Sequence, residues 1–177
     1  MCIGDRPKKM WSKKTPRPKR RPLLTQQSTP RAEHLSVVAM SASPLAGKRI
    51  VLGVTGGIAA YKAIEVSRRL VDLGAHVVPI MTDAAQHFVG PTTLSALASE
   101  PVQTELWHNA TTPIPHTSIG QGADLIIVAP ATAKSIAAYR MGYSHDLLQN
   151  TLIATRAPVI VCPAMHTEMW EHPSVVD

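Results

Sequence analysis

The residues best suited to chemistry lie in a glycine turn, between an apolar run and a helical pattern. Residues 50–62 read IVLGVTGGIAAYK, and the apolar run stops at Gly56 and Gly57, with the Thr55 hydroxyl beside them. Glycine lets a ligand approach the backbone, and the free N–H groups of a helix's first turn attract anions. The turn is a candidate phosphate site, although a tight strand-to-helix connection without a ligand could have the same sequence. Neither the dinucleotide pattern G-x-G-x-x-G nor a P-loop is present.

Histidine is the other residue type that suits this chemistry, and the chain has eight. An imidazole has an unperturbed pKa near neutrality, which suits proton transfer from a thiol or a carbon acid. For any one of them taken alone, a surface-loop histidine is the simpler interpretation. His166 and His172 with Glu168 could suggest a metal site, but their spacing matches no ligand pattern such as H-E-x-x-H. We therefore expect no metal.

A parallel sheet must position these residues. The apolar pattern predicts strands at residues 49–54, 76–81, 124–129 and 157–162, and helices at 57–73, from 84, at 92–99, from about 130 to 139 and at 146–154. This order predicts an α/β fold of three layers, in which helices cover both faces of a Rossmann- or flavodoxin-like parallel sheet. Pro79 lacks a backbone donor, so its strand should lie at an edge or carry a bulge.

Ligands of such sheets bind outside the carboxyl ends of the strands, near the switch in strand order. Four segments follow strand ends, at residues 56–57, 82–83, 130–134 and 163–170. We expect the chemistry of the protein there.

Charge divides the chain into two parts. Residues 1–45 hold ten Lys or Arg and two acidic residues, whereas the remainder holds eight and ten. We therefore predict a disordered, basic, Pro-rich tail over 1–45 and one folded domain over 46–177. The tail could contact nucleic acid or an anionic surface, or could be a transit peptide. We favour an over-extended N-terminus with Met40 as the true start, and nucleic-acid binding is disfavoured because Trp11 is the tail's single aromatic residue.

The two cysteines, Cys2 and Cys162, provide no disulfide framework, which predicts a reducing, cytoplasmic location. Cys162 lies in an apolar strand, and we expect it to be a small core residue. No apolar run approaches the roughly 20 residues of a membrane span, so no membrane association is expected.

Six motifs together resemble the flavin-dependent cysteine decarboxylases, most closely the phosphopantothenoylcysteine decarboxylase domain of coenzyme A biosynthesis. Over about residues 47–177 they are VTGGIAAYK (54–62), MTDAA (81–85), PHTS (115–118), ADLIIVAPATA (123–133), DLL (146–148) and PAMHTEMW (163–170). Their order and spacing, more than any single motif, carry the resemblance.

The resemblance implies FMN as the cofactor. Its phosphate would be held by the turn Gly56, Gly57 and Ile58, and Thr82 would also contact the flavin. The segment that lies against the flavin in the family corresponds to Ala129, Pro130, Ala131, Thr132 and Ala133.

The resemblance also implies a base and a substrate site. His116 matches the active-site histidine, and Met165, His166 and Met169 match the substrate motif, although a Met/Trp cluster is by default core packing. The substrate would be 4′-phospho-N-pantothenoylcysteine, oxidised to a thioaldehyde, decarboxylated and reduced to 4′-phosphopantetheine. Family members build this site between subunits, which implies a homotrimer or a trimer-based oligomer.

Three departures from the family pattern affect these expectations. His166 and Lys134 each replace an asparagine, and the chain ends at Asp177, before the family's flap with its catalytic cysteine and before a ligase domain. We therefore expect a truncated or split version with impaired activity. The alternative is a non-catalytic flavin-binding or interaction subunit. A decarboxylase of peptide C-terminal cysteines is a weaker alternative, because PAMHTEMW matches the pantothenoyl branch.

Overall fold

A computed structural model of the chain describes residues 43–107 and 112–176. The predicted tail over 1–45, with Met40, lies almost wholly outside the described residues, so the tail and its boundary stay predictions. Within the described residues, no helix is both long and apolar enough to span a bilayer.

Four parallel strands form one sheet in the order β2-β1-β3-β4. The strands are β1 (Arg49–Val54), β2 (His76–Met81), β3 (Leu125–Ala131) and β4 (Val159–Pro163). The chain leaves β2 and returns past β1 to form β3, so the order reverses between β1 and β3. The carboxyl ends of these two inner strands therefore border the place where such sheets bind ligands. Pro79 lies in the edge strand β2, as predicted from its missing donor.

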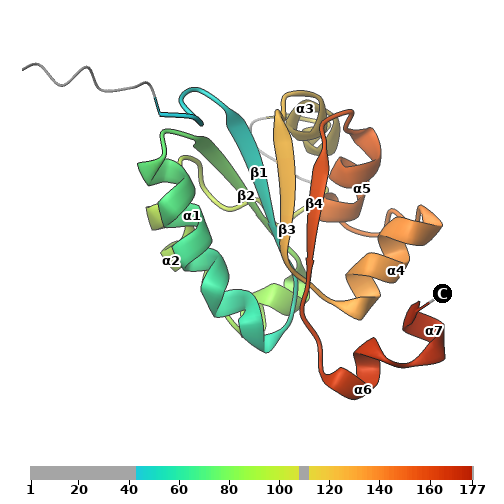
Figure 1. Cartoon of the computed structure of the whole chain (residues 1–177). Coiled ribbons are helices and arrows are strands. Elements are labelled where there is room, and N and C mark those ends of the chain that lie inside the picture. Colours follow the sequence, from blue (N-terminus) through green and yellow to red (C-terminus); the bar gives the residue numbers. More distant parts are fainter. Residues whose placement is uncertain (1–42, 108–111, 177) are drawn as a thin grey trace, which may run out of the picture. The chain divides into compact units, whose positions relative to one another are not determined.

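Helices cover both faces of the sheet (Figure 1). On one face lie α1 (Lys62–Asp72) and α2 (Pro91–Leu97), and on the other lie α3 (Pro115–Gln121), α4 (Ala133–Met141) and α5 (Leu147–Ala154). Short 3-10 helices η1 (Ile58–Tyr61) and η2 (Asp83–His87) follow the ends of β1 and β2, and α6 (Thr167–Trp170) and α7 (Pro173–Val176) follow β4. The predicted three-layer α/β fold is confirmed.

The strands are apolar at successive positions because both of their faces are buried. Ile50, Leu52 and Val54 face the α1 side, whereas Val51 and Ile126 face the side of α5. These five side chains are at most 1 % exposed, so the sheet holds the loops at its carboxyl end on a rigid support.

Local differences from the predicted elements arise around proline. Helix α3 lies in a region without a predicted element, and its sequence signal was Pro115 at the first helical position. Strand β3 continues through a cis peptide bond before Pro130 to Ala131, with a register shift against β4. Residues 167–176, without a predicted helix, form the two short helices α6 and α7.

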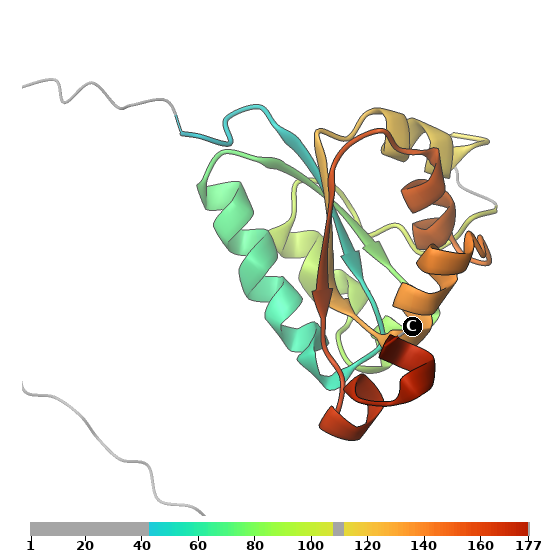
Figure 2. The same ribbon diagram turned by 45° about the vertical axis from the view of Figure 1, so that its right-hand side comes forward.

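The prediction that Cys162 is a core residue is wrong. Cys162 is exposed, and Ile160, on the same face of β4, is 48 % exposed. Strand β4 is at the sheet edge, and Figure 2 shows it in front with no helix before it. Helix α1 packs mainly against β1, β2 and β3. The apolar sequence therefore predicts the strand correctly, but it does not predict whether a helix packs over the face of that strand.

Candidate functional site

Three adjoining hollows form a groove at the carboxyl end of the sheet. The central hollow, of about 370 Å³, is lined by Thr55, Gly56, Thr82, Asp83, Ala84, Thr132, Ala133, Lys134, Ser135, His145, Asp146 and Met169. The methionine hollow, of about 480 Å³, is lined by Gly56, Gly57, Ile58, Ala59, Thr132, Ala133, Ala164, Met165, His166 and Met169. The outer hollow, of about 330 Å³, contains Trp107 and Glu105 and shares His145 and Asp146 with the central one. Each falls within the range of ligand sites.

The glycine turn has no room for a side chain at its first residue. A Cβ atom on Gly56 would lie 2.4 Å from the Cβ of Ala84, and one on Gly57 would lie 3.4 Å from Cγ2 of Thr132. Within the described residues no hydrogen bond is recorded from the backbone N–H of either glycine. The turn is therefore packed tightly against η2 while its donors stay free for a ligand.

Thr55 joins the glycine turn to the start of α4. Its hydroxyl donates to the Pro130 carbonyl oxygen at 2.7 Å and accepts from the Thr132 backbone N–H at 3.0 Å. The Thr55 side chain is buried, and both hydrogen bonds join it to other residues of the chain. We infer that Thr55 sets the spacing of the two loops, because its hydroxyl proton is already engaged in the folded chain.

Thr82 and Asp146 cap the helices on the other side of the groove. The Thr82 hydroxyl accepts from the Ala85 N–H at 3.3 Å, and the Asp146 carboxylate accepts from the Gln149 N–H at 2.8 Å. The caps fix the chain direction after β2 and before α5. The sequence pattern predicted helices from residue 84 and over residues 146–154, each within one residue of the start that the structure shows.

His145 also lines the groove, and the sequence analysis did not select it. Its Nε2 lies 3.3 Å from Oδ2 of Asp146, and its ring stacks on Tyr143 with ring centres 5.0 Å apart. The sequence signal that could have identified His145 is its position next to Asp146, the first residue of the DLL motif. His145 is held from two sides and presents an imidazole to the central and outer hollows.

The predicted substrate residues converge with the glycine turn. Met165, His166 and Met169 all line the methionine hollow, opposite Gly57 and Ile58. Nδ1 of His166 contacts the Glu168 carboxylate, and the His166 side chain is 77 % exposed. The other ring nitrogen of His166 is therefore left for a substrate group.

Four predicted site residues lie outside the groove. His116 lies on α3, is partly exposed, and does not line any of the three hollows. Its Nδ1 is buried and has no hydrogen-bond partner among the described residues. Ala129, Pro130 and Ala131 lie within β3, where Ala131 belongs to the core. A single copy of the chain therefore brings together the predicted cofactor and substrate loops but not the predicted base.

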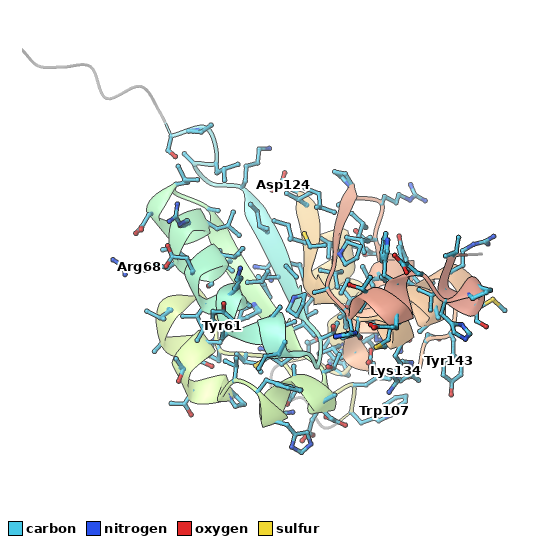
Figure 3. The ribbon with its side chains drawn as sticks, turned by 60° about the horizontal axis from the view of Figure 1, so that its bottom comes forward. Tyr61, Arg68, Trp107, Asp124, Lys134 and Tyr143 are labelled. Carbon is cyan, nitrogen blue, oxygen red and sulfur yellow. The ribbon has the colours of Figure 1, made fainter. Side chains whose placement is uncertain are left out.

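Charged groups with shifted pKa values lie at the opposite, amino end of the sheet. Burial raises the pKa of Glu100, but hydrogen bonds from His76 and Arg49 outweigh it, and the pKa lies below its usual value. The backbone N–H of Arg49 and the Lys48 ammonium lower the pKa of Asp124. Neither carboxylate lines any of the three hollows, and Figure 3 shows Asp124 at the end of the sheet away from Lys134.

Within the described ranges, no group of three or more His, Cys, Asp or Glu side chains is arranged to hold a metal ion. The groove instead offers backbone N–H groups, hydroxyls, one ammonium group, two imidazoles and apolar walls, beside the carboxylates of Asp83, Glu105 and Asp146. Such a set suits an organic ligand with an anionic end.

Comparison with known proteins identifies a protein family that this chain matches. The family described as Flavoprotein matches residues 38–176. The coenzyme A biosynthesis bifunctional protein CoaBC of Mycobacterium bovis is 48 % identical over 130 residues, which are 73 % of this chain and 31 % of that protein. The chain thus spans about a third of the length of this curated relative.

Solved structures with at least 25 % identity share the fold, and two of them serve as examples. An FMN-dependent cysteine decarboxylase, SpaF, superposes with a TM-score of 0.70 at 28 % identity, over 75 % of this chain and 77 % of its own. A PPC decarboxylase mutant superposes with a TM-score of 0.65 at 25 % identity, over 73 % of this chain and 77 % of its own.

Proposed function

We propose, from the premise that this chain belongs to the flavoprotein family, that it is an FMN-dependent decarboxylase domain of the phosphopantothenoylcysteine type. The substrate is 4′-phospho-N-pantothenoylcysteine and the product is 4′-phosphopantetheine, in the synthesis of coenzyme A. The observation that carries the proposal is the convergence of the glycine turn, the Thr132 loop and the Met165–Met169 motif on one groove.

The residues of the groove fit a flavin mononucleotide. Gly56 and Gly57 offer free N–H groups to the phosphate, and the tight contact of Gly56 with Ala84 fixes their direction. Ile58, Thr82, Thr132 and the neighbouring apolar atoms form walls for the rest of the cofactor. The flavin supplies the redox chemistry when bound.

The remaining tasks belong to side chains of this chain. Met165 and Met169 orient the substrate's thiol end against the groove, and His166 offers its free ring nitrogen to the substrate carboxylate. His116 accepts a proton from the substrate, because an imidazole exchanges protons near neutral pH. A cytoplasmic location fits this proposal, since reduced thiols persist there.

His116 reaches the groove from a second copy of the chain in this proposal. Two observations support that arrangement: His116 lies away from the hollows of its own copy, and β4 carries an exposed apolar face with Ile160. We propose a homotrimer or an assembly of trimers. Sedimentation should then give about three times the chain mass of 19.1 kDa for a trimer, or a multiple of that mass for an assembly of trimers.

The test is a flavin spectrum of the purified 177-residue chain, followed by addition of the substrate without air. Bound FMN that bleaches, with release of carbon dioxide, is the expected result. The variant His116→Asn should keep the bound flavin and lose the bleaching. His87→Asn, on the exposed side of η2, is the matched control and should behave as the parent.

The second candidate, a non-catalytic flavin-binding subunit, is favoured by the position of His116 outside the groove of its own copy. Bound flavin without bleaching or carbon dioxide would support it. A chain that folds, by circular dichroism, but binds no flavin would overturn both candidates.

A further inference from the structure

Lys134 is an exposed residue at an electrostatically unfavourable place in the fold. It is the second residue of α4, a helix of nine residues, and it lines the central hollow. The free N–H groups of a helix start carry partial positive charge, so a lysine there opposes the helix dipole. Figure 3 shows Lys134 at the carboxyl end of the sheet, on the same side of the molecule as Trp107 and Tyr143.

No acidic side chain offsets this charge directly. Among the described residues no ion pair of Lys134 is recorded, whereas Lys48, Arg49, Arg68 and Arg69 each pair with a carboxylate. The Asp146 carboxylate, which lines the same hollow, already faces His145 and the Gln149 N–H. Asp83 also lines it, and no ion pair between Asp83 and Lys134 is recorded among the described residues.

Backbone donors surround the same space. The N-cap residue Thr132 forms no side-chain cap bond, and no acceptor is recorded within the described residues for the N–H groups of Ala133 and Lys134. The glycine turn adjoins them, because a Cβ on Gly57 would lie 3.4 Å from Thr132. One anion in the central hollow could therefore meet both loop starts and the ammonium.

A phosphate suits these donors better than a flavin ring does. A phosphate monoester carries about −1.5 to −2 charge at pH 7, whereas the oxidised ring is uncharged. Asp83 and Asp146 would both repel such a group, and Lys134 is the Lys or Arg side chain among the described residues that lines the central hollow to offset them. Lysine binds phosphate as a point charge and does not need a fixed geometry.

We infer that Lys134 is a phosphate-binding residue that makes this groove select flavin mononucleotide over riboflavin. The inference rests on the proposed function, since it assigns a residue to the cofactor of that same groove. It gives a role to a residue that departs from the family pattern, in which an asparagine stands at this position.

The test compares the affinity of the flavin-free full chain for FMN and for riboflavin, by quenching of flavin fluorescence. Lys134→Met, which keeps the length of the side chain, should weaken FMN binding by about tenfold or more and leave riboflavin binding unchanged. Lys134→Arg should retain most of the preference. Arg140→Ala removes a positive charge from the last turn of the same helix and is the matched control.

The melting temperature of the flavin-free chain provides a second readout, and there the substitution should not be harmful. Without flavin, Lys134→Met should unfold at the same or a slightly higher temperature, because a charge opposed to the helix dipole is removed. The rise in melting temperature caused by FMN should be smaller than in the parent.

Three outcomes separate the possibilities. Equal losses for FMN and riboflavin in Lys134→Met would mean that the ammonium acts on the ring or on folding, which overturns the inference. Unchanged FMN affinity would also overturn it, while the proposed function would stand. If the parent chain binds neither flavin, the proposed function fails first, and the inference fails with it.

Discussion

At the scale of single residues, the site depends on a glycine that has no room for a side chain. Gly56 has no space for a Cβ, because Ala84 atoms lie at 2.4 and 2.7 Å from where that atom would be. The close approach comes from packing, since neither glycine of the turn adopts a left-handed backbone conformation. Gly56 and Gly57 are adjacent in sequence, but they should differ in how well they tolerate a larger side chain.

We therefore predict that Gly56→Ala destabilises the protein by about 1–3 kcal/mol, because overpacking shifts η2 away from the turn. Its affinity for FMN should fall in parallel. Gly57→Ala meets its nearest atom at ordinary contact distance and should change the free energy of unfolding by less than about 1 kcal/mol. Urea denaturation of both variants measures the difference, and equal effects would contradict the packing argument.

At the scale of elements, the amino ends of β1 and β2 are held together by one carboxylate. Glu100, which follows α2, accepts from Arg49 of β1 at 2.6 Å and lies 2.8 Å from Nε2 of His76 of β2. Its side chain is 29 % exposed, so solvent reduces the value of the ion pairs. The lowered pKa of Glu100 shows that the folded chain favours its ionised form.

The lowered pKa of Glu100 determines how its contribution to the free energy of unfolding changes with pH. A carboxyl group whose pKa is lower in the folded chain stabilises the fold above its unfolded pKa of about 4.3 and loses this effect as the pH falls through the folded value. Glu100→Gln should therefore lower the free energy of unfolding by about 1 kcal/mol at pH 7, after allowance for solvent.

The difference between the parent and Glu100→Gln should shrink as the pH falls below about 4.3, and it should vanish only below the lowered pKa of Glu100 in the folded chain, where both side chains are uncharged. Thermal unfolding across pH 3–7 measures it. Glu171→Gln, at an exposed position, is the control and should show no such trend. A constant difference over this range would rule out the charge of Glu100 as the cause.

At the scale of the whole molecule, one edge of the sheet is open. Cys162 and Ile160 lie on a face of β4 that no described helix covers, although the motif loops at the end of the same strand form part of the groove. A second copy placed there would bury apolar atoms near the groove, in agreement with the proposed assembly.

We predict that a thiol reagent labels Cys162 in the folded Cys2→Ser variant, without denaturant, at dilutions where sedimentation shows single chains. Labelling should slow as the concentration rises and copies associate. The double variant Cys2→Ser/Cys162→Ala is the control for non-specific reaction. Labelling that requires denaturant at every concentration would mean that the face is covered within one chain.

The sequence by itself determined the layers and most of the groove. Continuous apolar runs such as residues 50–54 predict buried parallel strands, and Gly56–Gly57, Thr82 and Asp146 predict the turns and caps that follow, because these signals are local. The comparisons confirm the family that the motif order suggested. The roles of individual residues, His116 among them, stay proposals.

Only the tertiary structure decided which residues share the groove. His145 lines the groove, Ala131 packs into the core, and His116 lies outside the groove, because distances between loops depend on strand order and register. The exposure of Cys162 was decided in the same way. An apolar pattern records the tendency of a strand to be buried, whereas its burial depends on which element packs against it.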